Sequence, residues 1–391
     1  MNVPVHGRIV GEQERTNLYQ VADSDWYTAG PWCDKFAKSL QTYLGVRHVA
    51  LCNSGSSANL LAISALELQP GDEVITTAVN FPTTVNPIIQ VGAIPVFIDV
   101  TLPHMVADVR QLEDALSPRT RAVVLAHTLG YPFELTSVVE FCKRHNLRLV
   151  EDCCDALGSR YGKNYVGSYG DFATYSFFPA HQITTGEGGA LVAKSAQLEK
   201  LAKSYRDWGR DCWCLPGNDN TCGTRFKGEY DHKYTYSRIG YHLQMTEFSG
   251  AVGTAQMDRL LGFVEKRRHN HALLRAMAWS RELNEYFMLP YACNHCQPSW
   301  FGFAMICNPG IDRNALCQWL DGQGVGNRPL FGGNLLRQPA YKSIEARIIG
   351  DLHNSNMVHE RAFWIGCWPG LEDDQLEYAI QKISEYVRRI A

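Results

Sequence analysis

The sequence predicts an α/β fold, with a mainly parallel, doubly wound sheet in a large domain and a smaller α+β domain after it. The first observation is a rhythm in the first half of the chain. Short apolar runs rich in β-branched residues alternate with stretches of helical apolar spacing, at about thirty residues per unit. The second is a long helix-like stretch at 245–278, which we interpret as the connector to the small domain. We therefore expect a large N-terminal unit over 1–261 and a small unit over 262–391.

The expected elements follow one another in order along the large domain. Apolar runs predict strands at 48–53, 72–78, 94–100, 121–127, 147–154, 172–178 and 188–194. Stretches with helical spacing fall between the earlier strands, at 54–68, 83–92, 112–117 and 137–146. The segment FFPAHQITTGEGG links the last two strands and places His181 in a turn.

Length and composition describe an ordinary globular chain. It has 391 residues, of which 45% are hydrophobic and 20% charged, and this is enough to bury a large core. The net charge of −3 gives no reason to expect a nucleic acid or an anionic membrane surface as a partner. No apolar run approaches the length of a membrane-spanning helix, and the first residues have no hydrophobic signal core. We therefore expect a cytoplasmic protein.

Thirteen cysteines are many for a cytoplasmic chain. Because disulfides are disfavoured in that compartment, buried thiols, metal ligands and redox groups are the better interpretations. Free cysteine packs like a small hydrophobe, so six of the thirteen are predicted to be core residues: Cys33, Cys52, Cys142, Cys307, Cys317 and Cys367.

Three positions after predicted strands are candidates for ligand binding. NSGSSANLL places Gly55 and Ser56 where a helix begins, and the free amides there suit a phosphate group, although a simple helix cap has the same composition. Asp152 ends an apolar strand and either points into the ligand crevice at the carboxyl edge of the sheet or caps a helix. Phe81 follows another strand and either stacks on a planar ring or belongs to the core.

Several motifs, taken in order, resemble the DegT/DnrJ/EryC1/StrS sugar aminotransferase family of fold-type I pyridoxal phosphate enzymes, which act on nucleotide-linked keto sugars. They run over nearly the whole chain: WYTAGP, GSSANLL, EDCCDALGS, SFFPAHQITTGEGG, GYHLQMTE and FWIGCWPG. The resemblance implies a homodimer with its active sites at the interface. It also implies these cofactor contacts: Gly55, Ser56 and Ser176 on the phosphate, Asp152 on the pyridine nitrogen, Phe81 over the ring, and Asp155 toward the ring oxygen.

His181 stands where most of that family has the lysine that forms a Schiff base with the cofactor. An imidazole cannot form a stable imine, but it can accept a proton near neutral pH. The resemblance therefore implies pyridoxamine phosphate (PMP) held without a covalent bond, with His181 as the base. The expected reaction is loss of the C3 hydroxyl of a sugar, and the alternative is a chain that only binds its ligands.

The segment 211–235 has little apolar periodicity and carries Cys212, Cys214 and Cys222 in the spacing C-x-C-x7-C. Four thiolates hold a [2Fe-2S] cluster, but they satisfy zinc equally well. With Cys154, the spacing is similar to that of the iron–sulfur CDP-4-keto-6-deoxyglucose 3-dehydrases. This second resemblance implies a nucleotide-linked 4-keto-6-deoxyhexose as substrate. It also implies an iron–sulfur flavin reductase or ferredoxin-type donor as partner. Cys153 is the alternative to Cys154, because neighbours along a strand point to opposite faces.

Two features depart from the family pattern. His242 stands in GYHLQMTE where the family has an asparagine that reaches the phosphate of the partner subunit, and an imidazole is expected to make that contact here. Cys293 and Cys296 form a C-x-x-C pair without further ligands at zinc spacing, and we expect exposed loop thiols there. A cluster-independent, glutamate-coupled 3-dehydratase is the competing enzyme hypothesis.

Overall fold

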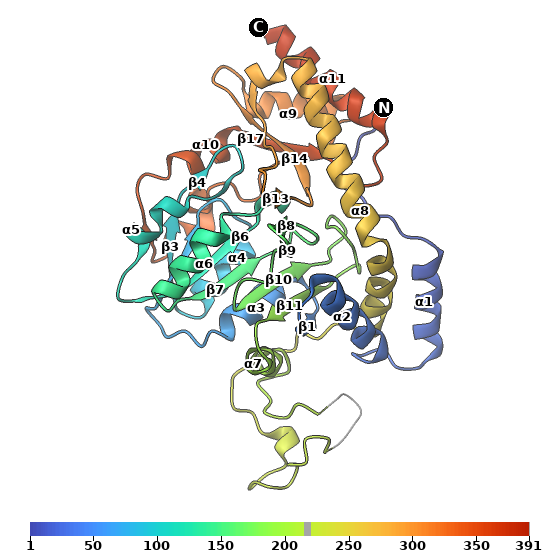
Figure 1. The fold of residues 1–391 in the computed structure, drawn as a ribbon, viewed down its shortest axis with the longest axis vertical. Helices are drawn as coiled ribbons and strands as arrows, with labels where there is room; N and C mark the ends of the chain where they lie inside the picture. The colour runs from blue at the N-terminus through green and yellow to red at the C-terminus, as the bar shows by residue number, and fades with distance from the viewer. Residues whose placement is uncertain (215–219, 391) are drawn as a thin grey trace.

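An eight-stranded sheet forms the centre of the computed structural model, which describes residues 1–214 and 220–390 (Figure 1). The strand order is β1-β11-β10-β7-β6-β2-β3-β16. Its members are β1 (His48–Cys52), β2 (Glu73–Thr77), β3 (Ile94–Ile98), β6 (Thr120–Ala126), β7 (Arg148–Asp152), β10 (Phe172–Ser176), β11 (Gly189–Ala193) and β16 (Arg347–Ile348). Only β11 runs antiparallel to its neighbours, β1 and β10. The predicted mainly parallel sheet is confirmed, with a strand at each expected position.

Helices cover both faces of this sheet, as a doubly wound fold requires. Apolar residues of α3 (Gly55–Ser64), α4 (Pro82–Gln90) and α7 (Ala196–Arg206) pack on one face. Those of α2 (Pro31–Leu44), α6 (Leu135–Arg144) and α8 (Glu247–Ser280) pack on the other. The stretch expected to be helical at 112–117 forms only the short α5 (Leu112–Ala115). The strand positions are buried from both sides, which explains their nearly continuous apolar sequence.

The long helix α8 leads from this sheet to a second one near the chain termini, of order β12-β14-β17-β15 (Figure 1). Its strands are β12 (Phe287–Met288), β14 (Gly302–Cys307), β17 (Ala362–Gly366) and β15 (Asn327–Pro329). They pack with the helices α9 (Arg313–Gly322), α10 (His353–Arg361) and α11 (Asp373–Ile390), and α1 (Glu12–Asp23) lies against α8. This region is α+β as expected. One strand from this region of the chain, β16, forms an edge of the large sheet. The division at 261/262 stays a prediction.

The remaining strands are short: β4 (Val100–Thr101), β5 (Val106–Ala107), β8 (Arg160–Tyr161), β9 (Asn164–Tyr165) and β13 (Cys296–Gln297). Pairing of β13 with β8 fixes the C-x-x-C turn, and the Cα atoms of Cys293 and Cys296 lie 5.1 Å apart in a disulfide. The expectation of exposed free thiols was therefore wrong, because Cys296 is buried. Among the described residues, no helix is both long and apolar enough to cross a membrane.

Five of the six cysteines predicted to be core residues are buried: Cys33, Cys52, Cys142, Cys307 and Cys367. The sixth, Cys317, packs against the core from α9 but remains partly exposed.

Candidate active site and cysteine loop

Asp152 lies at the carboxyl end of β7, where the ends of the parallel strands meet. Its carboxylate is buried and accepts hydrogen bonds from Asn59 Nδ2 (2.9 Å) and Thr84 Oγ1 (2.6 Å). The backbone N–H of Cys154 donates a third, at 3.1 Å. The chain turns after β7 and continues into β8, so Asp152 caps no helix. The ligand-crevice interpretation is the one that fits its position.

Glu151, the neighbour of Asp152 along β7, points to the opposite side of the strand. Its side chain is fully buried and accepts hydrogen bonds from the backbone N–H groups of Gly167 (2.7 Å), Tyr169 (2.8 Å) and Gly170 (2.7 Å). Glu151 therefore fixes the loop before β10. Strand alternation gives two adjacent carboxylates separate roles, one in the fold and one in the site.

The start of α3 is shaped for a group that approaches its backbone closely. Ser54 caps the helix by accepting from Ser57 N (3.1 Å), so Gly55 and Ser56 are not needed as caps. A Cβ on Gly55 would lie 2.5 Å from Ser176 Cβ and 3.0 Å from Cys154 Sγ. Only glycine fits there, and it brings the helix N-terminus against the end of β10. Backbone amides and a serine hydroxyl in this arrangement suit a phosphate.

Phe81 stands just before α4 and remains 52% exposed, with an edge-to-face contact to Phe331 at 6.3 Å between centroids. A core residue would be covered, so the core interpretation does not apply. The ring is available to a ligand.

His181 lies in the turn after β10, with its side chain 14% exposed. Nδ1 is 3.2 Å from the carbonyl oxygen of Phe178. Because a carbonyl oxygen only accepts, Nδ1 carries the proton and Nε2 is left as the acceptor. Nε2 lies 3.8 Å from Asp155 Oδ1. Burial lowers the pKa of His181 to about 4, so the imidazole is neutral at pH 7.

Asp155 faces the same space as His181. Burial, and then the nearby charge of Asp152, raise the pKa of Asp155 to about 7. Its carboxyl group also accepts a hydrogen bond from Leu129 N at 3.3 Å. The site thus holds a neutral imidazole beside an acid that exchanges a proton near neutral pH.

Arg267 of α8 fixes the turn that carries His181. Its guanidinium is 1% exposed and donates to the carbonyl oxygens of His181 (2.9 Å), Ala180 (3.3 Å), Trp300 (3.1 Å) and Phe301 (3.1 Å). Sequence reasoning missed this residue, because in the sequence nothing distinguishes Arg267 from other arginines of a long helix. It also missed the amide of Gln182, which donates to Asp155 O and to Ser299 O (3.0 Å).

The cysteine loop is residues 211–235, and its described part projects from the body of the molecule beyond α7 (Figure 1). Residues 215–219 of this predicted loop lie outside the described residues. The sulfur atoms of Cys212, Cys214 and Cys222 all lie within 4.8 Å of one another. Thr224 Oγ1 donates to Cys222 Sγ at 3.1 Å. Three thiols at this separation can hold a metal ion or a cluster.

The fourth predicted ligand lies elsewhere in the chain. Cys154 is partly exposed and its sulfur lies at the start of α3, beside Gly55, outside the three-thiol group of the loop. Cys153 is fully buried in the core, near Tyr175 and Glu151. The two neighbours point to opposite sides, as strand alternation predicts.

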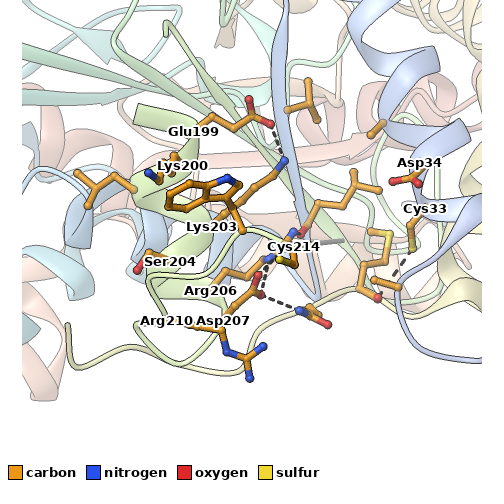
Figure 2. Close-up of a pocket in the computed structure, with 18 of the residues that line it drawn as sticks. Cys33, Asp34, Glu199, Lys200, Lys203, Ser204, Arg206, Asp207, Arg210 and Cys214 are labelled. Carbon is orange, nitrogen blue, oxygen red and sulfur yellow. Dashed lines mark hydrogen bonds and ion pairs between the residues drawn. The ribbon is translucent and has the colours of Figure 1, made fainter. Parts of the chain in front are cut away.

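A cavity of about 1810 Å³ separates the cysteine loop from the body of the protein. The entry to α2, the helix α7 and the loop line it, and Figure 2 shows Cys33 on α2 and Cys214 on the loop. Its polar wall includes the Arg206–Asp207 pair (2.8 Å). The Cys33 thiol nevertheless has a hydrogen-bond partner already, because it donates to Thr246 O at 3.4 Å.

His242 lies at the base of the cysteine loop, where its ring stacks on Trp208 at 4.5 Å between centroids. It is exposed. Contact with the phosphate of a partner subunit stays a prediction.

Comparison with known proteins shows the family of this chain. The model of the DegT/DnrJ/EryC1/StrS aminotransferase family matches residues 8–384. The chain belongs to this family. Among its relatives, the lipopolysaccharide biosynthesis protein RfbH of Salmonella typhimurium is 45% identical and covers 98% of this chain and 91% of its own. The dTDP-4-dehydro-2,6-dideoxy-D-glucose 3-dehydratase of Saccharopolyspora spinosa is 43% identical, with 98% and 86% covered.

Solved structures of the DegT/DnrJ/EryC1/StrS type share the whole fold. The GDP-4-keto-6-deoxy-D-mannose-3-dehydratase of E. coli with bound hydrated PLP has a TM-score of 0.90 and is 25% identical, covering 98% of this chain and 99% of that chain. A histidine-to-asparagine variant of GDP-4-keto-6-deoxymannose-3-dehydratase with bound GDP-perosamine has a TM-score of 0.89, also at 25% identity, with 98% and 100% covered.

Family membership identifies the chain as a sugar enzyme that uses PLP or PMP. The residues fit this cofactor. Asp152 is a buried carboxylate at the right edge of the sheet, Gly55 leaves room against Ser176 that a side chain would fill, and Phe81 is an uncovered ring. No lysine stands at the turn position held by His181.

Proposed function

We propose that this protein is a PMP- and [2Fe-2S]-dependent 3-dehydrase that removes the C3 hydroxyl from a nucleotide-linked 4-keto-6-deoxyhexose. The observation that carries the proposal is the neutral imidazole of His181, which lies beside Asp155 in a turn that Arg267 fixes, at a position where most of the family has a lysine. The three-thiol group of the cysteine loop supports the iron–sulfur part. The proposal includes a homodimer and a cytoplasmic location.

The site residues would hold the cofactor at three points. Asp152 would keep the pyridine nitrogen protonated, and the amides of Gly55 and Ser56 with the hydroxyl of Ser176 would bind the phosphate. Phe81 would cover the ring. When bound, PMP supplies an amine that joins the sugar at C4 and a ring that takes up electron density.

His181 would act through Nε2. This nitrogen carries no proton at neutral pH, and Nδ1–H on the Phe178 carbonyl fixes the direction of the ring. Nε2 would accept a proton from the cofactor methylene, which allows the C3 hydroxyl to leave. Asp155, with its pKa raised to about 7, is placed to supply a proton on the same side.

Replacing the C3–O bond by a C–H bond consumes two electrons and two protons and releases one water molecule. The cluster would carry these electrons one at a time from an iron–sulfur flavin reductase or a ferredoxin-type donor. Relatives at 45% and 43% identity are named as a lipopolysaccharide biosynthesis protein and a 3-dehydratase of a dTDP-linked deoxysugar, which supports chemistry at C3.

A second candidate is a cluster-independent 3-dehydratase coupled to glutamate. It is favoured by the relatives named GDP-4-keto-6-deoxy-D-mannose 3-dehydratase, one of which, from Yersinia pseudotuberculosis, is 28% identical over 94% of both chains. A chain that binds the nucleotide sugar without turnover is the non-catalytic alternative.

One experiment separates the three. The protein is purified without oxygen, and its absorption spectrum, iron and acid-labile sulfide are measured. Turnover of CDP-, GDP- and dTDP-4-keto-6-deoxyhexoses is then followed with a ferredoxin-type reductase or with glutamate. We expect two irons and two sulfides per chain and reductase-dependent loss of the C3 hydroxyl. A metal-free or zinc protein that is active with glutamate would replace the proposal by the second candidate, and no turnover with any sugar would favour the non-catalytic one.

A further inference from the structure

The cysteine loop offers one thiol too few for the cluster that the proposed function requires. A [2Fe-2S] cluster takes four thiolates, and the loop brings together only Cys212, Cys214 and Cys222. Six of the other free cysteines are buried in the core, and outside the loop only Cys154 and Cys317 are partly exposed among the described free cysteines. A fourth thiolate has few possible sources.

The structure excludes two of these sources. Cys317 lies on α9 beside the second sheet, at the opposite end of the molecule from the loop (Figure 1). Cys33 lines the same cavity as Cys212 and Cys214, but it is 6% exposed and its thiol is bound to the Thr246 carbonyl.

Cys154 is the remaining thiol, and within its own chain it faces the active site. Its sulfur lies against Gly55 and its backbone N–H binds Asp152. The loop extends from α7 away from the sheet instead of folding back over this edge (Figure 1). Cys154 therefore needs thiols that approach the active site from outside the chain.

The surfaces of the loop and of the active-site edge both carry uncovered apolar side chains. On and just after the loop, Ile239 is 95% exposed, Phe226 75% and Tyr230 71%. At the active-site edge, Phe81 is 52% exposed and Phe178 46%. Exposed aromatic and large aliphatic residues of this kind are side chains that a protein partner would cover. The partner that also completes the thiol set is a second copy of this chain.

We propose that the cluster is shared between two protomers, with Cys212, Cys214 and Cys222 supplied by the loop of one copy and Cys154 by the active-site edge of the other. This inference rests on the proposed function. It places the cluster two residues along the chain from Asp152 of the copy that it serves. A loop that projects from one protomer can thus deliver electrons to a buried site in its partner.

Mixed dimers test the proposal. The Cys154→Ala and Cys212→Ala chains carry different affinity tags, are produced together, and the dimer with one copy of each is purified through both tags. A shared cluster needs Cys154 of one copy and the loop of the other, so one of the two sites stays intact. We expect half of the wild-type iron, acid-labile sulfide and reduced-cluster EPR signal, while each single-variant homodimer has no cluster signal.

A second mixed dimer, called the mirror-image dimer here, controls for loss of the cluster through misfolding of a variant chain. It pairs a wild-type chain with a chain that carries both Cys154→Ala and Cys212→Ala. Sharing predicts no intact cluster here, whereas a cluster within one chain predicts half of the wild-type signal. A matched Cys33→Ala homodimer should keep the full signal.

Three results would overturn the inference. They are a cluster in the mirror-image dimer, no cluster in the first mixed dimer, or a full cluster in the Cys154→Ala homodimer. A wild-type protein that binds no iron would instead refute the cluster-dependent function itself, so the two failures are distinguishable.

Discussion

The active-site edge and the cysteine loop differ in how their functional groups are held. At the active-site edge, strand ends and two helices fix the groups. Asp152 has hydrogen-bond partners from α3 and α4, and Arg267 binds four carbonyl groups around His181. The described part of the loop has one helical turn, His232–Tyr234, and its base is closed by contacts such as Asp211 N to Thr235 O at 2.9 Å.

The difference follows from the chemistry of each region. A base must be in position before the proton moves, and misplacement by about 1 Å can cost a hundredfold in rate. A metal cluster supplies bonds of its own, so its ligands can be ordered when it binds. Under the proposed function, rigid scaffolding lies where His181 would act, and an extended loop would suffice for thiols that a cluster orders.

The largest expected effect comes from removing the base. His181→Asn should lower turnover by about a thousandfold, within the range of roughly 10²–10⁴ for a general base, because asparagine offers no basic nitrogen in place of Nε2. PMP and iron content should not change, and both are measured by absorption spectroscopy alongside turnover. His269→Asn, on the exposed side of α8, is the matched control. Unchanged turnover in His181→Asn would show that another residue moves the proton.

Arg267→Met tests how much the hydrogen bonds that fix the His181 turn contribute to stability. The change leaves four buried carbonyl groups without their charged donor, so the free energy of unfolding should fall by about 3–5 kcal/mol. Urea unfolding measures it. Arg275→Met is the control, since this guanidinium lies over Trp279 at 5.5 Å and should cost less than about 1 kcal/mol. Equal losses would contradict the positioning role.

The loss of unfolding free energy of the cofactor-free protein in acid should reveal the burial of His181. In the unfolded chain its pKa is near the ordinary 6.5, and in the folded protein it is about 4. As the pH falls from 6.5 to 4, the unfolded state gains a proton first, so stability is lost over this window, by at most about 3 kcal/mol. His181→Asn removes this part, while Asp155 titrates in both proteins. The free energy of unfolding, measured with urea at pH 7 and at pH 4.5, should therefore fall less between these two values in the variant than in the wild type. Equal losses would refute the lowered pKa of His181.

The smallest expected effect lies in the loop. Thr224→Val removes the hydroxyl that donates to Cys222 Sγ at 3.1 Å. A hydrogen bond to a ligand sulfur stabilises the reduced, more negative cluster, so the reduction potential should become more negative while iron content stays the same. An EPR redox titration measures the shift. Thr235→Val, whose hydroxyl binds the Asp231 carbonyl, should leave the potential unchanged. A shift in the positive direction would contradict the role of Thr224.

Much of the large domain was predictable because its signals are local. The alternation of buried strands and helices is repeated within every thirty residues or so, and the structure has a strand at each predicted position. The short α5 was overestimated, since a few apolar residues with helical spacing do not require a longer helix. The C-x-x-C pair was misjudged because its burial depends on β8, more than a hundred residues earlier.

The sequence by itself determined which chemical groups are present: a histidine where most of the resembled family has a lysine, an acid at the end of a strand, and three closely spaced thiols. Only the tertiary structure decided how these groups are used. It turned Glu151 toward the fold and Asp152 toward the site, brought Arg267 to the His181 turn, and separated Cys154 from the other thiols. The physical reason is that a residue type and its spacing are fixed along the chain. Burial, hydrogen-bond partners and pKa are set by atoms that meet only after folding.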